Sequence, residues 1–296
     1  MRVFVTGATG FIGSAIVAEL LRHGHRVLGL TRSDAGAQAL AGMGAEVHRG
    51  DLEDLDSLRR GAAQSDGVIH CAFDHDFSNF VANCEKDSRA IAALGSALAG
   101  SDRPLVVTSG VGMGSLEHSQ PAVEDVFNPE HPNPRRASEL AANALAADGI
   151  NVSIVRLPQV HDTTKHGLIT YFIAVARDKG VSAFVDDGGN RFAAAHVLDV
   201  ARLYRLAIER GEPGARYHAV AEEGVALRDI AEVIGRGLGV PSVSLSSEQA
   251  ATHFGWLGMF AGHDMTALSA QTKAKLDWAP MGPGLLQDLE GHFKTP

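Results

Sequence analysis

The sequence of 296 residues contains only two cysteines, Cys71 and Cys84, which are too few for a disulfide framework or a thiolate zinc site. It has no uninterrupted apolar run of the roughly 18 residues that a membrane span needs, and its N-terminal residues do not form a secretory signal. It also lacks an excess of basic residues: the formal net charge of −9 argues against nucleic-acid or anionic-membrane partners. We therefore expect a cytoplasmic protein that binds a small-molecule substrate, with neither nucleic acid nor membrane as a partner.

Short β-rich runs alternate with longer Ala- and Leu-rich stretches through the first 160 residues. This alternation predicts parallel strands joined by crossover helices, and the nearly continuous apolar character of the strands fits a sheet covered on both faces. We therefore predict an α/β fold built on a doubly wound parallel sheet. The expected strands are Arg2–Thr6, Arg26–Thr31, Glu46–Arg49, Gly67–Cys71, Pro104–Ser109 and Asn151–Arg156. The expected helices are Phe11–His23, Ala35–Met43, Asn79–Ala99 and Pro134–Asp148.

The strongest motif is the glycine loop Thr6–Gly13, which follows the first expected strand and opens the first helix. Gly7 permits a tight turn, Gly10 lets the backbone approach a pyrophosphate, and Gly13 lets the helix pack closely on the strand. The N-terminus of the helix offers N–H donors and a partial positive charge to a phosphate. This strand–turn–helix context predicts a Rossmann dinucleotide site, with a purely structural turn as the alternative. The loop residues expected to touch the cofactor also include Thr9, Phe11 and Ile12.

The end of the second expected strand reads Thr31, Arg32 and Ser33, where an NAD site usually carries an acid for the adenosine ribose hydroxyls. An acid would repel a 2′-phosphate, whereas arginine and serine can hold one through charge-assisted hydrogen bonds. We therefore predict NADP as the cofactor, with NAD as the alternative. The competing interpretation of Arg32 is a solvated side chain.

Further cofactor contacts are expected where the later strands end. Asp51 could accept a hydrogen bond from the adenine amino group while Leu52 packs on the ring; alternatively, Asp51 caps the next helix. The remaining expected cofactor residues are Ala72, Phe73, Thr108, Leu157, Pro158 and Val160.

These segments together resemble the short-chain dehydrogenase/reductase superfamily, in particular its extended branch of NAD(P)-dependent epimerase/dehydratase type. The resemblance implies a Rossmann fold, a nicotinamide cofactor and a substrate site beside it. The motifs that carry it are Thr6–Gly13, Gly50–Leu52, Val106–Ser109, Asn133–Leu140, Val155–Pro158 and His196–Val200.

The resemblance also implies an active-site serine on the fifth strand, followed by a Tyr-x-x-x-Lys motif on the next helix. Ser109 keeps the serine position, but Arg135 stands where the tyrosine is expected and Glu139 where the lysine is expected. The chain is therefore similar to an atypical member of the superfamily, and the usual proton chemistry cannot be transferred to it.

Arg135 and Glu139 lie four residues apart on one expected helix, so they can pair on one face. Arginine stays protonated near neutral pH and cannot serve as a proton donor, but its N–H groups can stabilise a developing oxyanion or anchor an anionic group. Glu139 could accept hydrogen bonds from ribose hydroxyls. The alternative is an exposed ion pair without a chemical role.

His161, just after the sixth strand, is the candidate proton donor because histidine titrates near neutral pH; the alternative is a solvated loop histidine. The connection Gly110–Asn133 is either a substrate lid or a surface insertion. We predict no metal site, because the histidines lack metal-motif spacing. The residues expected around the substrate are Asp74, His75, Val111, Met113 and Tyr171.

After Arg156 the pattern loosens into shorter elements, which suggests a smaller C-terminal lobe. We assign residues 1–157 and part of 190–212 to the dinucleotide-binding domain, and residues 158–189 and 213–296 to a substrate-binding lobe. The Ala-rich helix Pro134–Asp148 is compatible with a monomer or a homodimer. The expected elements of this part are Gly167–Lys179, Val197–Arg210 and Leu227–Leu238 as helices, and Val181–Val185 and Arg216–Val220 as extended segments.

Three functions fit these observations. The first is an NADP(H)-dependent oxidoreductase that reduces a carbonyl or related group of a small organic substrate with a non-standard active site. The second is a non-catalytic NADP(H)-binding sensor or interaction protein, which the two replaced catalytic residues would suit. The third is an epimerase or dehydratase with tightly bound cofactor, although such reactions depend on the same missing base.

Overall fold

The computed structural model describes residues 1–115 and 120–294 of the chain. Its main element is a seven-stranded parallel sheet with the order β10-β6-β5-β4-β1-β2-β3, which confirms the predicted doubly wound α/β fold. The strand order reverses between β1 and β4, the switch point at which such sheets bind ligands. The strands are β1 (Arg2–Thr6), β2 (Arg26–Thr31), β3 (Glu46–Arg49), β4 (Gly67–His70), β5 (Leu105–Gly110), β6 (Val152–Leu157) and β10 (Arg216–His218).

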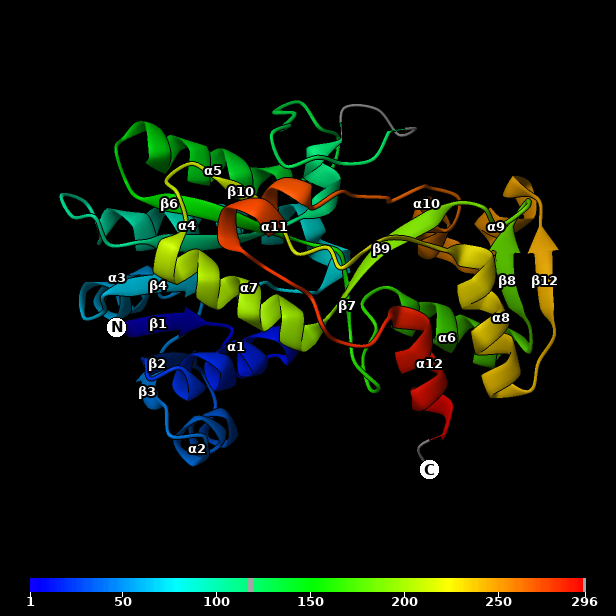
Figure 1. The fold of residues 1–296 in the computed structure, drawn as a ribbon, viewed down its shortest axis with the longest axis horizontal. Helices are drawn as coiled ribbons and strands as arrows, with labels where there is room; N and C mark the ends of the chain where they lie inside the picture. Colours follow the sequence, from blue (N-terminus) through cyan, green and yellow to red (C-terminus); the bar gives the residue numbers. More distant parts are fainter. Residues whose placement is uncertain (116–119, 295–296) are drawn as a thin grey trace.

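Helices cover both faces of this sheet (Figure 1). One face packs against α1 and α7, with Leu20 and Leu203 in a shared core. The other face packs against α3, α4 and α5, with Ile91 and Ala142 in a second core. These helices are α1 (Phe11–Arg22), α2 (Asp34–Gly42), α3 (Leu55–Ala63), α4 (Phe80–Ser96), α5 (Arg136–Ala147) and α7 (Val197–Arg210), and the short helix η1 (Phe77–Asn79) precedes α4.

The remaining elements form a lobe with its own apolar core, which occupies the right-hand part of Figure 1. A three-stranded sheet has the order β11-β9-β7, and β12 pairs with β8. The strands are β7 (Gln159–His161), β8 (Ser182–Val185), β9 (Arg191–His196), β11 (Glu222–Ala226) and β12 (Ser242–Leu245). The helices of the lobe are α6 (Ile169–Lys179), α8 (Leu227–Leu238), α9 (Ser247–Phe254), η3 (Gly255–Leu257), α10 (Gly258–Ala261) and α12 (Leu285–Lys294), whereas α11 (Ala270–Leu276) lies beside the seven-stranded sheet.

The structure differs from the expected domain boundaries at one place. Strand β10, which those boundaries put in the smaller lobe, pairs with β6 as the edge strand of the seven-stranded sheet. Helix α11 lies against β10 and α7. Sequence periodicity locates a short edge strand but does not say which sheet it joins, because that pairing is made between segments far apart in the chain.

The connection 110–133 contains the short helix η2 (Val111–Gly114), and its residues 116–119 lie outside the described part of the chain. Beyond that gap it is held by the smaller lobe: the backbone of Ala122 bonds to Thr266 and Leu268, both at 2.9 Å. The carboxylate of the buried Glu124 accepts hydrogen bonds from the backbone and the hydroxyl of Thr272 at 3.0 and 3.1 Å. The described part of this connection is therefore anchored at residues 122–124.

Among the described residues, we find no helix with both the length and the apolar character needed to cross a bilayer.

Candidate functional site

A cleft of about 1050 Å³ lies at the carboxyl ends of the central parallel strands. Its volume reaches the upper end of the ~300–1,000 Å³ typical of small-molecule sites. The residues expected to hold the cofactor all line this cleft. They are Gly7, Thr9, Gly10, Phe11, Ile12, Gly13, Thr31, Arg32, Ser33, Asp51, Leu52, Ala72, Phe73, Thr108, Leu157, Pro158 and Val160.

The glycine loop has a shape that side chains would block. Gly7 has a φ of +68°, and a Cβ atom there would come within 2.8 Å of the backbone nitrogen of Ala72. A Cβ on Gly13 would collide with the carbonyl of Gly7. Gly10 caps the N-terminus of α1 without a side-chain hydrogen bond, so no side chain caps the first N–H groups of the helix. This cradle fits the pyrophosphate of a dinucleotide.

Just after the end of β2, Arg32 is exposed and has no ion-pair partner among the described residues. Ser33 caps α2, and its Oγ accepts a hydrogen bond from the backbone of Gly36 at 3.1 Å. The next acid along the chain, Asp34, pairs with Arg49 and does not line the cleft. The end of β2 therefore presents a guanidinium and hydroxyls, without a carboxylate.

Asp51 lines the cleft, but its Oδ1 atom accepts hydrogen bonds from the backbone of Glu53 and Asp54 at 2.8 and 3.0 Å. The cap of α3 is Asp54, which accepts from the backbone of Ser57 at 2.9 Å. Asp51 therefore shapes the turn that precedes the helix, and its Oδ2 atom has no hydrogen-bond partner among the described residues.

Arg135 immediately precedes α5, and its guanidinium lines the cleft. Its Nη1 group donates to Asp87 Oδ2 and to Ser138 Oγ, both at 2.6 Å, and its Nη2 group donates to the Thr108 carbonyl at 3.2 Å. The guanidinium carbon lies 4.0 Å from the ring centre of Phe73. These contacts fix the plane of the guanidinium. Within the described part of the chain, its Nε–H and second Nη2–H have no hydrogen-bond partner.

Asp87 of α4 is fully buried and holds Arg135 in place. It also bonds to His70 Nε2 at 2.9 Å and to Ser138 Oγ at 2.6 Å, while His70 Nδ1 lies 2.8 Å from Thr6 Oγ1. Burial opposes its ionisation, but Arg135 and these hydrogen bonds hold the pKa of Asp87 well below its usual range. The expected pairing of Arg135 with Glu139 is therefore wrong, because the arginine pairs with an acid from another helix.

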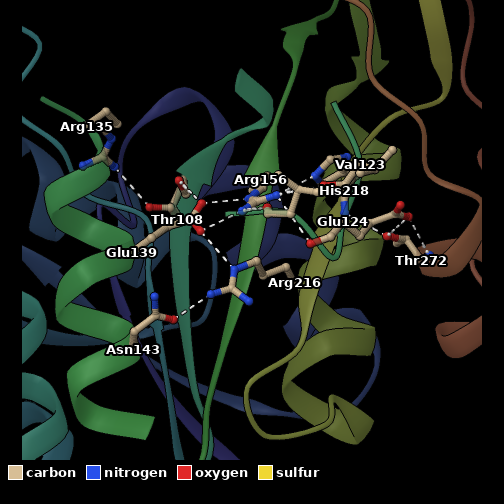
Figure 2. Close-up of polar contacts among 12 residues, drawn as sticks. Thr108, Val123, Glu124, Arg135, Glu139, Asn143, Arg156, Arg216, His218 and Thr272 are labelled. Carbon is tan, nitrogen blue, oxygen red and sulfur yellow. Dashed lines mark hydrogen bonds and ion pairs between the residues drawn. The ribbon is translucent and has the colours of Figure 1, made fainter. Parts of the chain in front are cut away.

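Glu139 is fully buried and does not line the cleft. Its carboxylate accepts from Arg156 Nε and Nη2, both at 2.8 Å, and from Arg216 Nε at 3.1 Å (Figure 2). Burial opposes ionisation, but Arg156 and Ser109 lower the pKa of Glu139. This places Glu139 in a structural ion-pair network and not at the cofactor ribose, which corrects the expectation from its position in the sequence.

Ser109 lines the cleft, but its hydroxyl donates to Glu139 Oε1 at 2.7 Å. A serine hydroxyl carries one proton, so Ser109 cannot donate to a substrate oxygen while this bond stands. Arg135, by contrast, lines the cleft with two N–H groups that have no hydrogen-bond partner among the described residues.

The structure does not bring three other expected site residues to the cleft. His161 is fully buried, and its Nδ1 atom bonds to Asp288 Oδ2 of α12 at 2.7 Å. Burial lowers the pKa of His161 more than Asp288 raises it. Val111 and Met113 are buried, Val111 in a small apolar cluster with Ala122 and other residues. These side chains face the protein interior because Val111 packs against Ala193 of β9 and His161, at the end of β7, is covered by α12.

Asp74, His75 and Tyr171, all expected near the substrate, do line the cleft. The ring of His75 stands edge-on to Phe73, with the ring centres 5.3 Å apart. Burial, followed by the charge of Arg135, lowers the pKa of His75. Among the described residues, His75 is the only histidine that lines the cleft.

Two lysines of the cleft are absent from the expected site. Lys86 pairs with Asp74 at 2.9 Å and with Glu53 at 3.3 Å. Lys165 lies 5.5 Å from the ring centre of Phe11 and has no carboxylate partner among the described residues. The only signal in the sequence for a role of Lys165 in the cleft was its position in the segment that follows β7. Lys165 and Arg32 are the cleft cations that carry no ion pair in the described structure.

Comparison with known proteins identifies the family of this chain. Residues 3–220 match the model of the NAD dependent epimerase/dehydratase family. The chain is 44% identical to an uncharacterized protein of Schizosaccharomyces pombe, covering 98% of both chains. It is 29% identical to a UDP-glucose 4-epimerase of Streptomyces lividans, covering 94% of this chain and 91% of the other. It is 26% identical to a 4-hydroxy-2-methyl-3-oxo-4-farnesyl-3,4-dihydroquinoline-1-oxide ketoreductase of Stigmatella aurantiaca, covering 86% and 80%.

Among solved structures, a dTDP-glucose 4,6-dehydratase of Streptomyces venezuelae with bound NAD shares the fold, with a TM-score of 0.77 and 22% identity. The match covers 100% of this chain and 98% of the other.

Proposed function

The chain belongs to the NAD dependent epimerase/dehydratase family, and on that premise we propose that it is an NADP(H)-dependent oxidoreductase. Its reaction is the reduction of a carbonyl group on a small organic substrate. The observation that carries the proposal is Arg135, whose guanidinium is fixed in the cofactor cleft by Asp87 with two N–H groups left to donate.

The ribose end of the cleft supports NADP over NAD. Arg32 offers an unpaired guanidinium, and Thr31 and Ser33 offer hydroxyls, where a carboxylate would repel a 2′-phosphate. Lys165, at the glycine-loop residue Phe11, adds positive charge near the expected pyrophosphate. An acidic protein thus concentrates positive charge where an anionic cofactor binds.

When bound, NADPH supplies a hydride to the carbonyl carbon of the substrate. The electron pair of the C=O π bond then moves onto the oxygen. The Nε–H and Nη2–H groups of Arg135 donate to that oxygen and stabilise its developing negative charge. Because Asp87, Ser138 and the Thr108 carbonyl already orient the guanidinium, little reorganisation is needed as the charge develops.

The oxygen must also receive a proton to become an alcohol. Arg135 cannot give one, and His161 is bonded to Asp288 away from the cleft. We assign this step to His75, whose imidazolium donates directly or through a water molecule. Its lowered pKa makes the protonated ring a stronger acid, although it is less populated at neutral pH.

A non-catalytic NADP(H)-binding protein is the second candidate. The observation that favours it is Ser109, whose single proton is donated to the buried Glu139. Such a protein would bind NADPH with the same cleft and turn over no substrate.

The test is NADPH oxidation in the presence of a panel of aldehydes and ketones, with Arg135→Gln as the variant. We expect wild-type turnover and a fall in kcat/KM of about 10²–10³ in the variant, as for the loss of an oxyanion donor. Arg136→Gln is the matched control, because Arg136 donates to the His131 carbonyl and does not line the cleft. Tight NADPH binding without turnover would favour the non-catalytic sensor. Isomerisation of a substrate without net consumption of NADPH would favour an epimerase.

A further inference from the structure

An apolar surface continues from the cleft onto the smaller lobe. Tyr171 of α6 lines the cleft and is 40% exposed. Its ring meets that of Trp256 in η3 edge-to-face, with ring centres 5.2 Å apart. Trp256 in turn contacts Phe260 of α10, with ring centres 6.3 Å apart. The ring of Phe260 is half-buried. We call Tyr171, Trp256 and Phe260 the aromatic shelf.

The shelf rests on a packed core. Phe172 and Phe254, neighbours of shelf residues along the chain, are each 4% exposed, and their ring centres lie 5.2 Å apart. Leu257, directly after Trp256, is 1% exposed. Because Phe172 and Ile173 of α6 and Leu257 of η3 are buried in this core, the backbone that carries the shelf is held in place. The shelf is therefore a formed surface and not a loose end of the lobe.

The exposed rings of the shelf indicate a surface that binds a ligand. Of the large apolar side chains exposed in the described residues, only Tyr171 and Trp256 are aromatic, and they contact each other. Apolar side chains that are exposed singly are common on soluble proteins, whereas contiguous apolar patches are found at binding surfaces. Since Tyr171 belongs both to the cleft wall and to the shelf, a molecule that occupies the cleft can extend directly onto the shelf.

The uncharged side chains of the shelf indicate which kind of ligand it binds. Its three side chains carry no charge, and their only polar groups are one hydroxyl and one indole N–H. The chain reaches α6 from the end of β6, on the side of the sheet away from β2 and β3, where Arg32 and Leu52 lie at the expected adenosine site. The shelf therefore extends the substrate end of the cleft and not the adenosine end.

We propose that the substrate is a carbonyl compound whose uncharged aromatic or bulky alicyclic group lies on the aromatic shelf, with its carbonyl oxygen at Arg135. This inference rests on the proposed function for the carbonyl and on the shelf alone for the apolar group. It makes Tyr171 and Trp256 specificity-determining residues, whose loss weakens substrate binding more than the chemical step.

The chain provides a direct reporter for this proposal. It has two tryptophans: Trp256 is 48% exposed, whereas Trp278 is 2% exposed and donates to the Asp199 carbonyl at 3.0 Å. Iodide in solution should therefore quench mainly Trp256. We expect cyclohexanecarbaldehyde to protect the fluorescence of the NADP⁺-loaded protein from iodide in a saturable manner. Trp256→Phe should abolish the protected signal.

Kinetics then test specificity. We expect Trp256→Ala and Tyr171→Ala each to raise the KM for cyclohexanecarbaldehyde about tenfold, and to raise the KM for acetaldehyde, which has no group on the shelf, much less. Met281→Ala is the matched control, because Met281 is 76% exposed and belongs to neither the shelf nor the cleft lining.

The outcomes separate the two proposals. Protection from iodide without NADPH oxidation would support the shelf and overturn the reductase. NADPH oxidation with equal kcat/KM for acetaldehyde and cyclohexanecarbaldehyde, without protection, would support the reductase and overturn the shelf. Protection by UDP-glucose but not by the aldehyde would also overturn the proposal, since the shelf would then bind a nucleotide base.

Discussion

The Nη1 atom of Arg135 lies 2.6 Å from Oδ2 of Asp87, a fully buried carboxylate on a different helix. The arginine that occupies the expected tyrosine position is therefore oriented by a carboxylate of α4, together with Ser138 of α5. A buried acid that also bonds to His70 and Ser138 gives this cation one preferred orientation.

Loss of the Asp87 carboxylate should affect stability and catalysis together. In Asp87→Asn, we expect the free energy of unfolding to fall by about 3–5 kcal/mol, since one partner of a buried ion pair is removed. We also expect kcat to fall more than KM rises, because Arg135 loses its orientation. Urea unfolding and steady-state kinetics measure both. Asp56→Asn, which breaks the exposed Asp56–Arg59 pair, should cost less than about 1 kcal/mol.

Arg32 should set the cofactor preference. In Arg32→Ala, we expect NADPH affinity to fall at least about tenfold while NADH affinity changes little, since the charge-assisted bonds to the 2′-phosphate are lost. Titration of both cofactors by fluorescence measures the two affinities. Arg26→Ala is the control, because Arg26 lies at the opposite end of strand β2. An unchanged preference for NADPH in Arg32→Ala would contradict the assignment.

His75 should control the pH dependence of reduction. Burial, followed by the charge of Arg135 and opposed by Asp74, lowers the pKa of His75. A general acid works only when protonated, so we expect kcat/KM to fall as the pH rises through a value below about 6.5. His75→Gln should remove this dependence, and the surface variant His23→Gln should keep it. An unchanged pH profile in His75→Gln would assign the proton to another donor.

Two buried histidines should weaken the fold in acid. Burial lowers the pKa of His166 and of His218 to about 4, with Arg156 adding to the effect at His218. The unfolded chain, with a histidine pKa near 6.5, then binds more protons than the folded chain between about pH 6.5 and pH 4. The contribution of the two neutral histidines to stability is therefore fully present above about pH 6.5. The free energy of unfolding falls as the pH drops toward 4, by up to about 3 kcal/mol for each histidine.

His166→Phe tests this account by urea unfolding at pH 7.5 and pH 5. Neither ring nitrogen of His166 has a hydrogen-bond partner in the described structure, and the ring packs edge-on to His292. We expect the variant to be more stable at both pH values, and its loss of stability at pH 5 to be smaller than in the wild type. An acid loss as large as in the wild type would show that His166 does not cause it.

The sequence was sufficient to predict that the residues expected to hold the cofactor line one cleft. Gly7, Gly10 and Gly13 act through local backbone geometry, and strand ends such as that of Arg32 lie at one edge of any parallel sheet. Helices α7 and α8 also begin and end at the expected residues, because their apolar periodicity is strong.

The polar partners could not be predicted in the same way. Asp87 lies 48 residues from Arg135 along the chain, and Glu139 is satisfied by Arg156 and Arg216, which come from two other strands. Helical spacing favoured pairing between Arg135 and Glu139. In the folded chain, Arg135 instead pairs with Asp87, and Glu139 pairs with Arg156. Burial of His161 depends likewise on α12, more than a hundred residues downstream.

The most direct test of the account is transfer of deuterium from NADPH carrying deuterium at C4 of the nicotinamide to a carbonyl substrate. The protein is incubated with each C4-deuterated epimer of the cofactor and with cyclohexanecarbaldehyde, and the alcohol is analysed by mass spectrometry. We predict deuterium on the carbinol carbon with one epimer and its near absence with Arg135→Gln. Tight binding of NADPH with no labelled alcohol from either epimer, in the wild-type protein and across the carbonyl panel, would contradict the proposed function.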